Sequence, residues 1–351
     1  MSTLKVDAIR HNSATSDAIT TAADGTCTGK ITNYPHRNLF LNGALNISQR
    51  GNSYSSANAY TADQWYMFAT GSTTTRETSS PPDGFTYYLR CPSTSNSIIF
   101  SQQIELDAQG KVGKYKNKTV TVSWYARTES SNTMYVDAAF KNASGGGDYT
   151  AVRSGTSDIK TLTSSWARYS STFTISATPH ANNKCFSIMI RTPSSGSGST
   201  GTLEATGFQC EFGDTATDFE HVSNGEEYIR CSRHLVQYNN LGTSDDQPQL
   251  FLGVAADNND LFGQIFLPNA MRAHPTLSYS SADHFAYTRV FGGGSGVVGG
   301  SLFISYATSF PHQAMPMRAN CSPNPGWSQG DVYLIRMIGG NNGYLRFSAE
   351  I

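Results

Sequence analysis

A chain of 351 residues is long enough for two ordinary domains and an extension. Its formal charge is −1 and only 15% of its residues are charged, which argues against nucleic acid as a partner because phosphate binding needs a basic surface. The 32 glycines, 18 tyrosines and 18 phenylalanines, with abundant Ser, Thr and Asn, favour short β-strands joined by polar turns.

We expect neither a secretory signal nor a membrane span. The opening MSTLKVDAIRHN contains no apolar stretch of the signal-peptide kind, and no run of 18 apolar residues occurs. The six cysteines lack CxxC spacing, so we predict no zinc site and no dense disulfide scaffold. They are interpreted as small core or strand residues of a protein made in a reducing cytoplasm: Cys27, Cys91, Cys185, Cys210, Cys231 and Cys321.

Residues 1–37 differ in character from the rest of the chain. Sparse strand-like alternation surrounds an Asp24-Gly25 turn, which is a hairpin signal because Asp-Gly accepts positive φ at little cost. The segment has too few large apolar residues for a core of its own. It is either disordered alone or an arm that pairs with copies of itself or with another protein. We expect the second, because a disordered tail would usually carry more charge.

A linker at Asn33-Tyr34-Pro35 leads into a region of regularly spaced strands. Residues 38–51 alternate apolar and polar around an Asn-Gly turn, and a strand then enters the core through Trp65. Further strands are expected between Gly/Ser/Asn loops, of which 194–200 is the most permissive. Their ranges are 86–90, 97–104, 119–126, 134–140, 168–175, 186–191 and 201–212. This punctuation predicts an antiparallel sandwich over residues 38–222.

Residues 223–237 carry the only convincing helical pattern. Tyr228, Cys231 and Leu235 recur at spacings of three and four, and Asn224 is the expected cap. We interpret the segment as a connector helix and hinge between two β regions. Its charged positions are interpreted as a solvated or inter-subunit face: Glu226, Glu227, Arg230 and Arg233.

Residues 238–351 predict a second small β-sandwich. Its strands are expected over 250–255, 261–267, 276–279, 285–290, 301–306, 331–337 and 344–351. Pro268 and Pro275 bracket Met271-Arg272, which indicates a bend or an edge. The run GGGSGVVGG at 292–300 is expected to be a flexible loop.

Enzyme, cofactor and metal motifs are not found. The sequence contains no GxSxG, HExxH, Walker A or GxGxxG in a strand–helix context. The acidic clusters Asp245-Asp246 and 257–260 are interpreted as turns, since the second lacks the Gly and distal Glu of an EF-hand loop. Glu105 with Asp107 would be a conceivable glycosidase pair, but nothing in the sequence fixes their separation or raises a pKa. We predict no catalytic residue, no metal and no cofactor.

Aromatic side chains are the better candidates for function, because sugars can stack their C–H faces on Trp and Tyr rings. Three tryptophans in or beside strands are expected in the core: Trp65, Trp124 and Trp166. Trp327 lies in a loop sequence, SPNPGWSQGD, and is as readily an exposed contact as a packed one. For Tyr87 and Tyr88, as for the three strand tryptophans, core packing is favoured over ligand contact. Trp327, Tyr87 and Tyr88 are the candidate ligand contacts.

Several segments resemble bacteriophage proteins. NLFLNGALNISQRG with YTADQWYM, closed by FQCEFGDTATDFEH, resembles the jelly-roll module of phage tail and fibre proteins, which is similar to a broad class of carbohydrate-binding domains. The matching positions are Asn38, Leu39, Asn42, Gly43, Gln209, Glu211, Gly213 and Phe219. Related domains often hold calcium through acidic residues after the opening Asn-Gly. Here that position is Ala44, so calcium is not expected.

The resemblance continues beyond this module. GEEYIRCSRHLVQY resembles the GEEL-x-x-CQRYY segment that follows it in many phage tail proteins. QIFLPNAMRAHPTLSY and YLRFSAEI resemble strands of the C-terminal domain of those proteins, and the opening residues resemble leaders of marine phage structural proteins.

This resemblance implies a non-enzymatic virion protein, assembled in the host cytoplasm. We expect a homotrimer without nucleic-acid binding or membrane insertion, anchored to tail or capsid proteins through residues 1–37. Its sandwiches would touch host surface polysaccharide. Three alternatives stay open: a tail fibre or receptor-binding appendage for host attachment, a capsid decoration or head fibre, and a glycan-active depolymerase.

Overall fold

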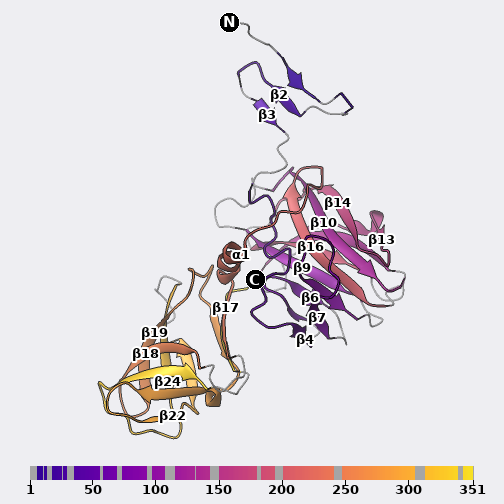
Figure 1. The fold of residues 1–351 in the computed structure, drawn as a ribbon. Helices are drawn as coiled ribbons and strands as arrows, with labels where there is room; N and C mark the ends of the chain where they lie inside the picture. Colours follow the sequence, from indigo (N-terminus) through magenta and orange to yellow (C-terminus); the bar gives the residue numbers. More distant parts are fainter. Residues whose placement is uncertain are drawn as a thin grey trace.

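The computed structural model describes residues 6–10, 12–13, 18–25, 27–29, 35–55, 58–68, 73–92, 97–106, 115–130, 132–142, 150–179, 183–193, 201–240, 247–304, 313–338 and 343–350. Within these residues strands dominate, with one α-helix and two short 3-10 turns. The expected all-β class is therefore confirmed. Figure 1 shows a small N-terminal arm, a large sandwich, and a C-terminal β domain joined to the sandwich beside α1 (Asn224–Ser232).

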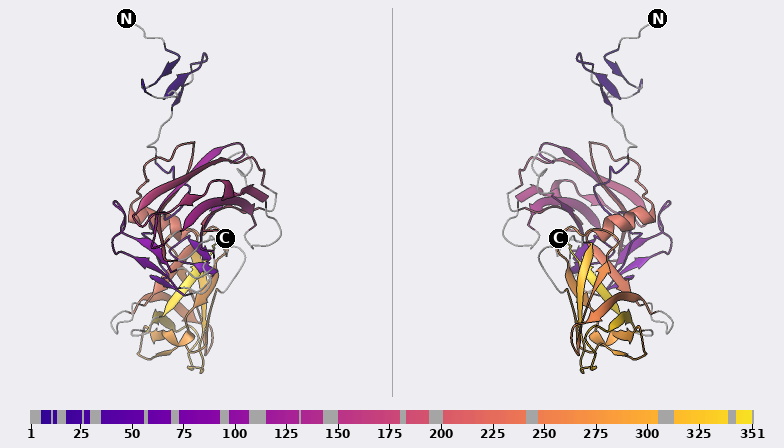
Figure 2. Two further views of the ribbon diagram at one scale, coloured as in Figure 1. Left: turned by 90° about the vertical axis from the view of Figure 1, so that its right-hand side faces the viewer. Right: turned by 90° about the vertical axis from the view of Figure 1, so that its left-hand side faces the viewer.

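The N-terminal arm is a three-stranded antiparallel sheet. It consists of β1 (Ala8–Ile9), β2 (Ile19–Thr21) and β3 (Cys27–Gly29) in that order. Gly25 has φ +86°, as the hairpin prediction requires. Ile9 and Ile19 are exposed, and the described strands of the arm stand clear of the sandwich in all views (Figures 1 and 2). Its pairing with other chains stays a prediction.

Two antiparallel sheets form the sandwich and curve together, as Figure 2 shows. The first runs β14 (Ala167–Thr174), β10 (Thr119–Thr128), β16 (Leu203–Phe212), β8 (Tyr88–Cys91), β7 (Thr74–Glu77) and β4 (Ser53–Tyr54). The second runs β12 (Thr150–Arg153), β11 (Thr133–Lys141), β15 (Cys185–Arg191), β9 (Ile99–Glu105), β6 (Tyr66–Phe68) and β5 (Asn58–Tyr60), with β13 (Lys160–Thr161) beside β11. The expected core positions of Trp65 and Trp124 are confirmed, whereas Trp166 is only half-buried.

The opening segment, 38–51, contains no strand, contrary to the alternation read from its sequence. Asn42 has φ +53°, which turns the chain away from an extended course. The Asn38 side chain accepts hydrogen bonds from the backbone N–H groups of Phe40 (3.0 Å) and Cys210 (2.9 Å). A Cβ on Gly43 would lie 2.1 Å from the carbonyl oxygen of Phe208. The Asn and Gly of this motif thus fasten the opening segment to β16.

The connector differs from its prediction in two respects. Ser223, rather than Asn224, caps α1 by accepting the N–H of Glu226 at 3.3 Å. Leu235 lies in β17 (Leu235–Asn239), because the helix ends at Ser232 and the chain becomes extended. This strand runs across the boundary predicted between residues 237 and 238. The division of the chain into domains at the predicted positions stays a prediction.

The C-terminal domain packs a three-stranded sheet against a seven-stranded one. The first has the order β17, β26 (Tyr344–Ser348) and β20 (Thr276–Tyr279). The second has the order β22 (Ser295–Val297), β21 (Phe285–Arg289), β25 (Val332–Met337), β18 (Gln249–Ala255), β19 (Asp260–Phe266), β24 (Ala314–Asn320) and β23 (Ser301–Ile304). Residues 267–275 form the expected bend. The sequence prediction missed β24, and β22 lies inside the run predicted as a loop.

Buried polar contacts join the two domains beside the connector. Arg50 and Glu350, with 11% and 5% of their side chains exposed, form a bidentate ion pair. Gln49 donates to the carbonyl oxygen of Leu235 at 2.8 Å and accepts the N–H of Gln237 at 2.9 Å. The interpretation of the connector as a hinge stays a prediction.

The remaining sequence predictions concern an acidic turn, the cysteines, three segments outside the described residues, and membrane spans. Asp257 accepts the N–H groups of Asn259 and Asp260, which is the expected turn chemistry. All six cysteines are free and five are buried. Residues 194–200, Asp107 and Asp245-Asp246 lie outside the described residues. In the described part of the chain, no helix has the length and apolar character needed to cross a membrane.

Candidate functional site

Trp327 is buried, which favours the packed alternative over the exposed contact. Only 6% of the residue is exposed, and its ring packs in one cluster with Tyr287 (centroid distance 5.0 Å) and Tyr333 (4.8 Å), whose own ring centroids are 5.8 Å apart. Its backbone N–H donates to the carbonyl oxygen of Asn258 at 3.0 Å, which draws the loop onto the domain. With so little exposed surface, this indole is poorly placed to stack on a sugar.

Tyr87 and Tyr88 lie in the sandwich, away from Trp327 in the other domain. Tyr88 is 3% exposed and donates its hydroxyl to the carbonyl oxygen of Ser79 at 2.8 Å. The guanidinium carbon of Arg76 lies 3.3 Å from the ring centroid of half-buried Tyr87, so one face of that ring is occupied. The structure thus does not bring the three candidates together. Their part in ligand binding stays a prediction.

A polar cavity of about 310 Å³ lies where the sandwich meets the connector helix. We call it the junction cavity. It is bounded by the opening segment, the end of β9, Tyr115 and the C-terminal end of α1. The side chains that line it are His36, Asn38, Leu39, Leu41, Gln102, Gln103, Ile104, Glu105, Tyr115, Arg230, Arg233 and His234.

Glu105 is the charged centre of the junction cavity. Its two carboxylate oxygens lie 3.5 Å from Arg233 and 3.3 Å from Arg272. Arg272 also donates to the carbonyl oxygen of Ala349 at 3.0 Å. One carboxylate therefore joins the sandwich, the helix end and the C-terminal domain, and it holds Arg233 in place.

Of the four charged helix positions interpreted as a solvated or inter-subunit face, Glu227 is buried, Arg230 is half-buried, and Glu226 and Arg233 are exposed. Glu227 is 7% exposed and accepts the backbone N–H of Asn42 at 2.8 Å. Burial raises the pKa of the Glu227 carboxyl. Arg230 lies 3.9 Å from Glu227 and lines the cavity with 22% of its side chain exposed. Glu227 thus ties the helix to the opening segment and sets the position of Arg230.

The two histidines of the junction cavity differ in environment. Burial, reinforced by the neighbouring Arg272 and Arg233, lowers the pKa of His234 to about 3, so its ring is neutral at pH 7. His36 is 64% exposed, and its Nδ1 lies 3.4 Å from Glu226 at the mouth of the cavity.

The arrangement offers neutral and charged hydrogen-bonding groups beside an apolar wall. Gln103, Glu105 and the two arginines supply donors and acceptors, while Leu39, Leu41 and Ile104 supply aliphatic surface. Sequence reasoning missed this site because its residues come from segments as far apart as 36–41 and 230–234. The one available signal was the charged cluster on the connector helix.

These features define an all-β protein of two β domains with a polar cavity at their junction. No protein-family model matches the chain, and no curated protein matches it.

Among solved structures, the chain is similar to a CBM22 xylan-binding domain from Paenibacillus barcinonensis, with 13% identity over 47% of this chain and 94% of that one and a TM-score of 0.30. It is similar to a putative sugar binding protein from Bacteroides thetaiotaomicron (12% identity, 50% and 100% covered, TM-score 0.36). A third similarity is to the enzymatically active domain of tailspike protein 4 from bacteriophage CBA120 (14%, 51% and 22%, 0.31). Such low identities and scores carry no functional conclusion for this chain.

Proposed function

We propose that the protein is a structural protein of a bacteriophage virion: a homotrimeric tail fibre or receptor-binding appendage that recognises host surface glycans without cleaving them. The observation that carries glycan recognition is the junction cavity, with its polar groups held in fixed positions. The resemblance of 38–51, 208–221 and 225–238 to phage tail proteins supports the virion assignment.

The chemistry of the junction cavity suits a saccharide. Hydroxyl groups both donate and accept, and planar side chains such as those of Gln103 and Arg230 can bind two neighbouring hydroxyls at once. The aliphatic wall at Leu39 and Leu41 matches the C–H face of a pyranose ring. Because Arg233 is already oriented by Glu105, binding would cost little side-chain entropy.

A non-enzymatic role is part of this proposal. Glycoside cleavage uses two carboxyl groups, one on each side of the scissile bond. Glu105 is the one carboxylate among the described residues that line the junction cavity, and it is held between two arginines. These contacts occupy both oxygens of the carboxylate, which opposes a role in catalysis.

The N-terminal arm supports attachment to other chains. Its short strands leave open sheet edges, and Ile9 and Ile19 are exposed. We therefore propose residues 1–37 as the anchor to tail or capsid proteins. Deletion of residues 1–33 tests this anchor: the shortened protein should fold and fail to enter virions, and normal incorporation would contradict it.

Host adsorption tests glycan recognition. The purified protein should block phage adsorption and bind host polysaccharide, and Arg230→Ala or Gln103→Ala should weaken that binding about tenfold, as loss of one strong hydrogen bond would. Arg90→Ala is the matched control, because Arg90 is 37% exposed and lies on the sandwich outside the cavity. Equal binding by all variants would remove the cavity from the proposal.

Location on the particle separates the alternatives. Gold labelling at the tail tip would support an appendage, and labelling across capsid hexamers would support a capsid decoration protein. Release of reducing sugar ends from host polysaccharide would contradict the non-enzymatic role and support a depolymerase.

A further inference from the structure

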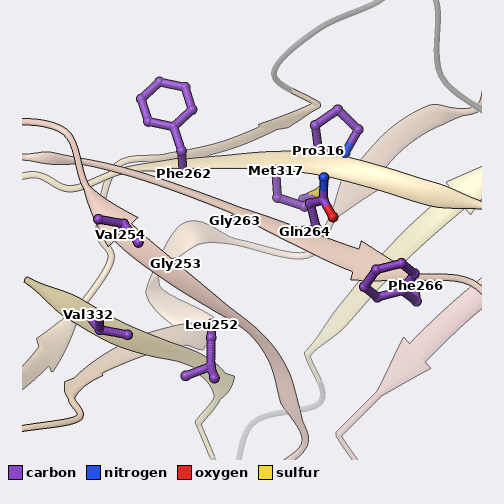
Figure 3. Close-up of a pocket in the computed structure, with 10 residues that line it drawn as sticks. All are labelled: Leu252, Gly253, Val254, Phe262, Gly263, Gln264, Phe266, Pro316, Met317 and Val332. Carbon is purple, nitrogen blue, oxygen red and sulfur yellow. The ribbon is translucent and has the colours of Figure 1, made fainter. Parts of the chain in front are cut away.

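The seven-stranded sheet of the C-terminal domain has an apolar groove of about 650 Å³ on its outer face. Figure 3 shows the groove, which we define by Leu252 and Val254 of β18, Phe262 and Phe266 of β19, Pro316 of β24 and Val332 of β25. We propose that this apolar groove binds a second copy of the same chain. The inference rests on the oligomer in the proposed function, but not on its glycan ligand or its place on a virion.

The groove arises from an unusual strand pattern. In β18, Phe251, Gly253 and Ala255 face the core, so Leu252 and Val254 point outward. An antiparallel sheet with one face in water normally places polar residues on that face. Here Leu252 is 57% exposed, Val254 49% and Phe266 68%. Such clustering on central strands is typical of a surface that is covered in the assembled state.

The lining argues against a sugar as the occupant. Gln264 is the one polar side chain among the ten described residues that line the groove. A saccharide would lose hydration of its hydroxyls there without gaining enough hydrogen-bond partners. The matching surface is another apolar protein face.

Charge points to a copy of this chain rather than to a foreign protein. Two ion pairs flank the groove within the chain: Asp260 accepts from Arg318 at 2.8 and 2.6 Å, and Asp331 accepts from Arg289 at 2.7 Å. Arg336, on the same face of β25 as Val332, donates to the neutral side chains of Thr288 and Gln247. A different protein would normally be selected by a complementary charge pattern. With most of the flanking charges paired, the same face of several copies can meet around one axis.

The extent of the surface suits this contact. The exposed groove side chains present roughly 300–400 Å² of apolar surface, about half of the ~800 Å² that each partner contributes to a standard interface. Phe303 on β23, 43% exposed, extends the apolar surface beyond the groove, with Arg318 lying over its ring at 5.7 Å. Three such faces can meet around a three-fold axis, as the proposed homotrimer requires.

Sedimentation equilibrium of the full chain over a hundredfold range of concentration tests the proposal. We expect an oligomer for the wild type and a monomer for Leu252→Lys/Phe266→Lys, with at least a hundredfold weaker association. The matched control is Ile159→Lys/Phe291→Lys, which adds the same charge at sites that are 47% and 75% exposed and outside the groove. It should associate as the wild type does.

If the lysine variant fails to fold by circular dichroism, Leu252→Ser/Phe266→Ser provides an uncharged test with the same expected loss of mass. A wild-type monomer would overturn both this proposal and the homotrimer. An oligomer that survives in folded groove variants would overturn this proposal alone and would leave the arm as the contact. Neither result depends on glycan binding.

Discussion

The junction cavity and the apolar groove belong to one chain but present opposite chemistry. The cavity is lined by arginines, glutamines and a glutamate whose positions are fixed by partners within the chain. The groove is lined by Leu, Val and Phe side chains, of which Leu252, Val254 and Phe266 are 57%, 49% and 68% exposed. Polar groups that already have partners can select a small hydroxylated ligand, whereas open apolar carbon gains most from a large dry contact.

The contrast also separates residues that stabilise the fold from residues that are free to act on a partner. Trp327 and Phe266 are both aromatic and both lie in the C-terminal domain, yet one is 6% and the other 68% exposed. The same kind of side chain therefore has a structural task at one position and is available for association at the other.

The largest expected effect is the loss of stability when the buried residue Trp327 is replaced. Trp327→Ala should lower the free energy of unfolding by about 4 kcal/mol, because it removes a large buried ring from the cluster with Tyr287 and Tyr333. Urea unfolding measures this change. Phe266→Ser, as the control, should leave stability nearly unchanged and alter only association. A neutral Trp327→Ala variant would show that the indole is not a core residue in solution.

The next effect concerns the polar contact between the domains. Arg50→Met should destabilise the protein by about 3 kcal/mol, because Glu350 would remain buried without its counter-charge. Burial raises the pKa of Glu350 and Arg50 opposes that rise, so the loss should be smaller at pH 5, where the carboxyl is more readily protonated. The double variant Arg50→Met/Glu350→Gln should recover part of the stability. A double variant as unstable as the sum of its singles would rule out coupling.

The smallest of the three expected effects is the pH dependence of stability that His234, in the wall of the junction cavity, contributes. With the pKa of His234 lowered from 6.5 to about 3, the unfolded chain takes up a proton below pH 6.5 and the folded chain does not. Stability contributed by this group is full above pH 6.5 and falls as pH falls, by about 2 kcal/mol between pH 7 and pH 5.

Comparison of wild type with His234→Gln isolates this contribution. Asp63, Glu227 and Glu350 have raised pKa values, so they favour the folded state as pH falls and act in the opposite direction. The difference between the two pH profiles cancels their contribution. Identical profiles would mean that His234 is accessible to protons in the folded protein.

The strands were predictable because their signals are local. Strand β16 was expected over 201–212 and is found at Leu203–Phe212, since alternation and flanking turns are properties of neighbouring residues. The helix was located for the same reason, although Ser223 took the capping position assigned to Asn224. Strand β24 was missed because Pro316 and the short apolar run around it do not read as a central strand.

The candidate site was not predictable from the same signals. Trp327 lies in a loop by its sequence, and only tertiary packing reveals that the loop folds back onto the core. Glu227 looks like any charged helix residue until the N–H of Asn42 is found against it. Burial of a polar side chain depends on a partner far along the chain, and no local pattern reports that partner.

The ion pair between Arg50 and Glu350 has a kinetic consequence. Its partners are 300 residues apart in sequence, so it forms only after both domains have brought their strands together. Contacts between such distant residues require the closure of long loops, which slows their formation. The junction should therefore be among the last parts of the molecule to fold. During that interval each domain exists as a separate folded body with its polar junction groups still in water.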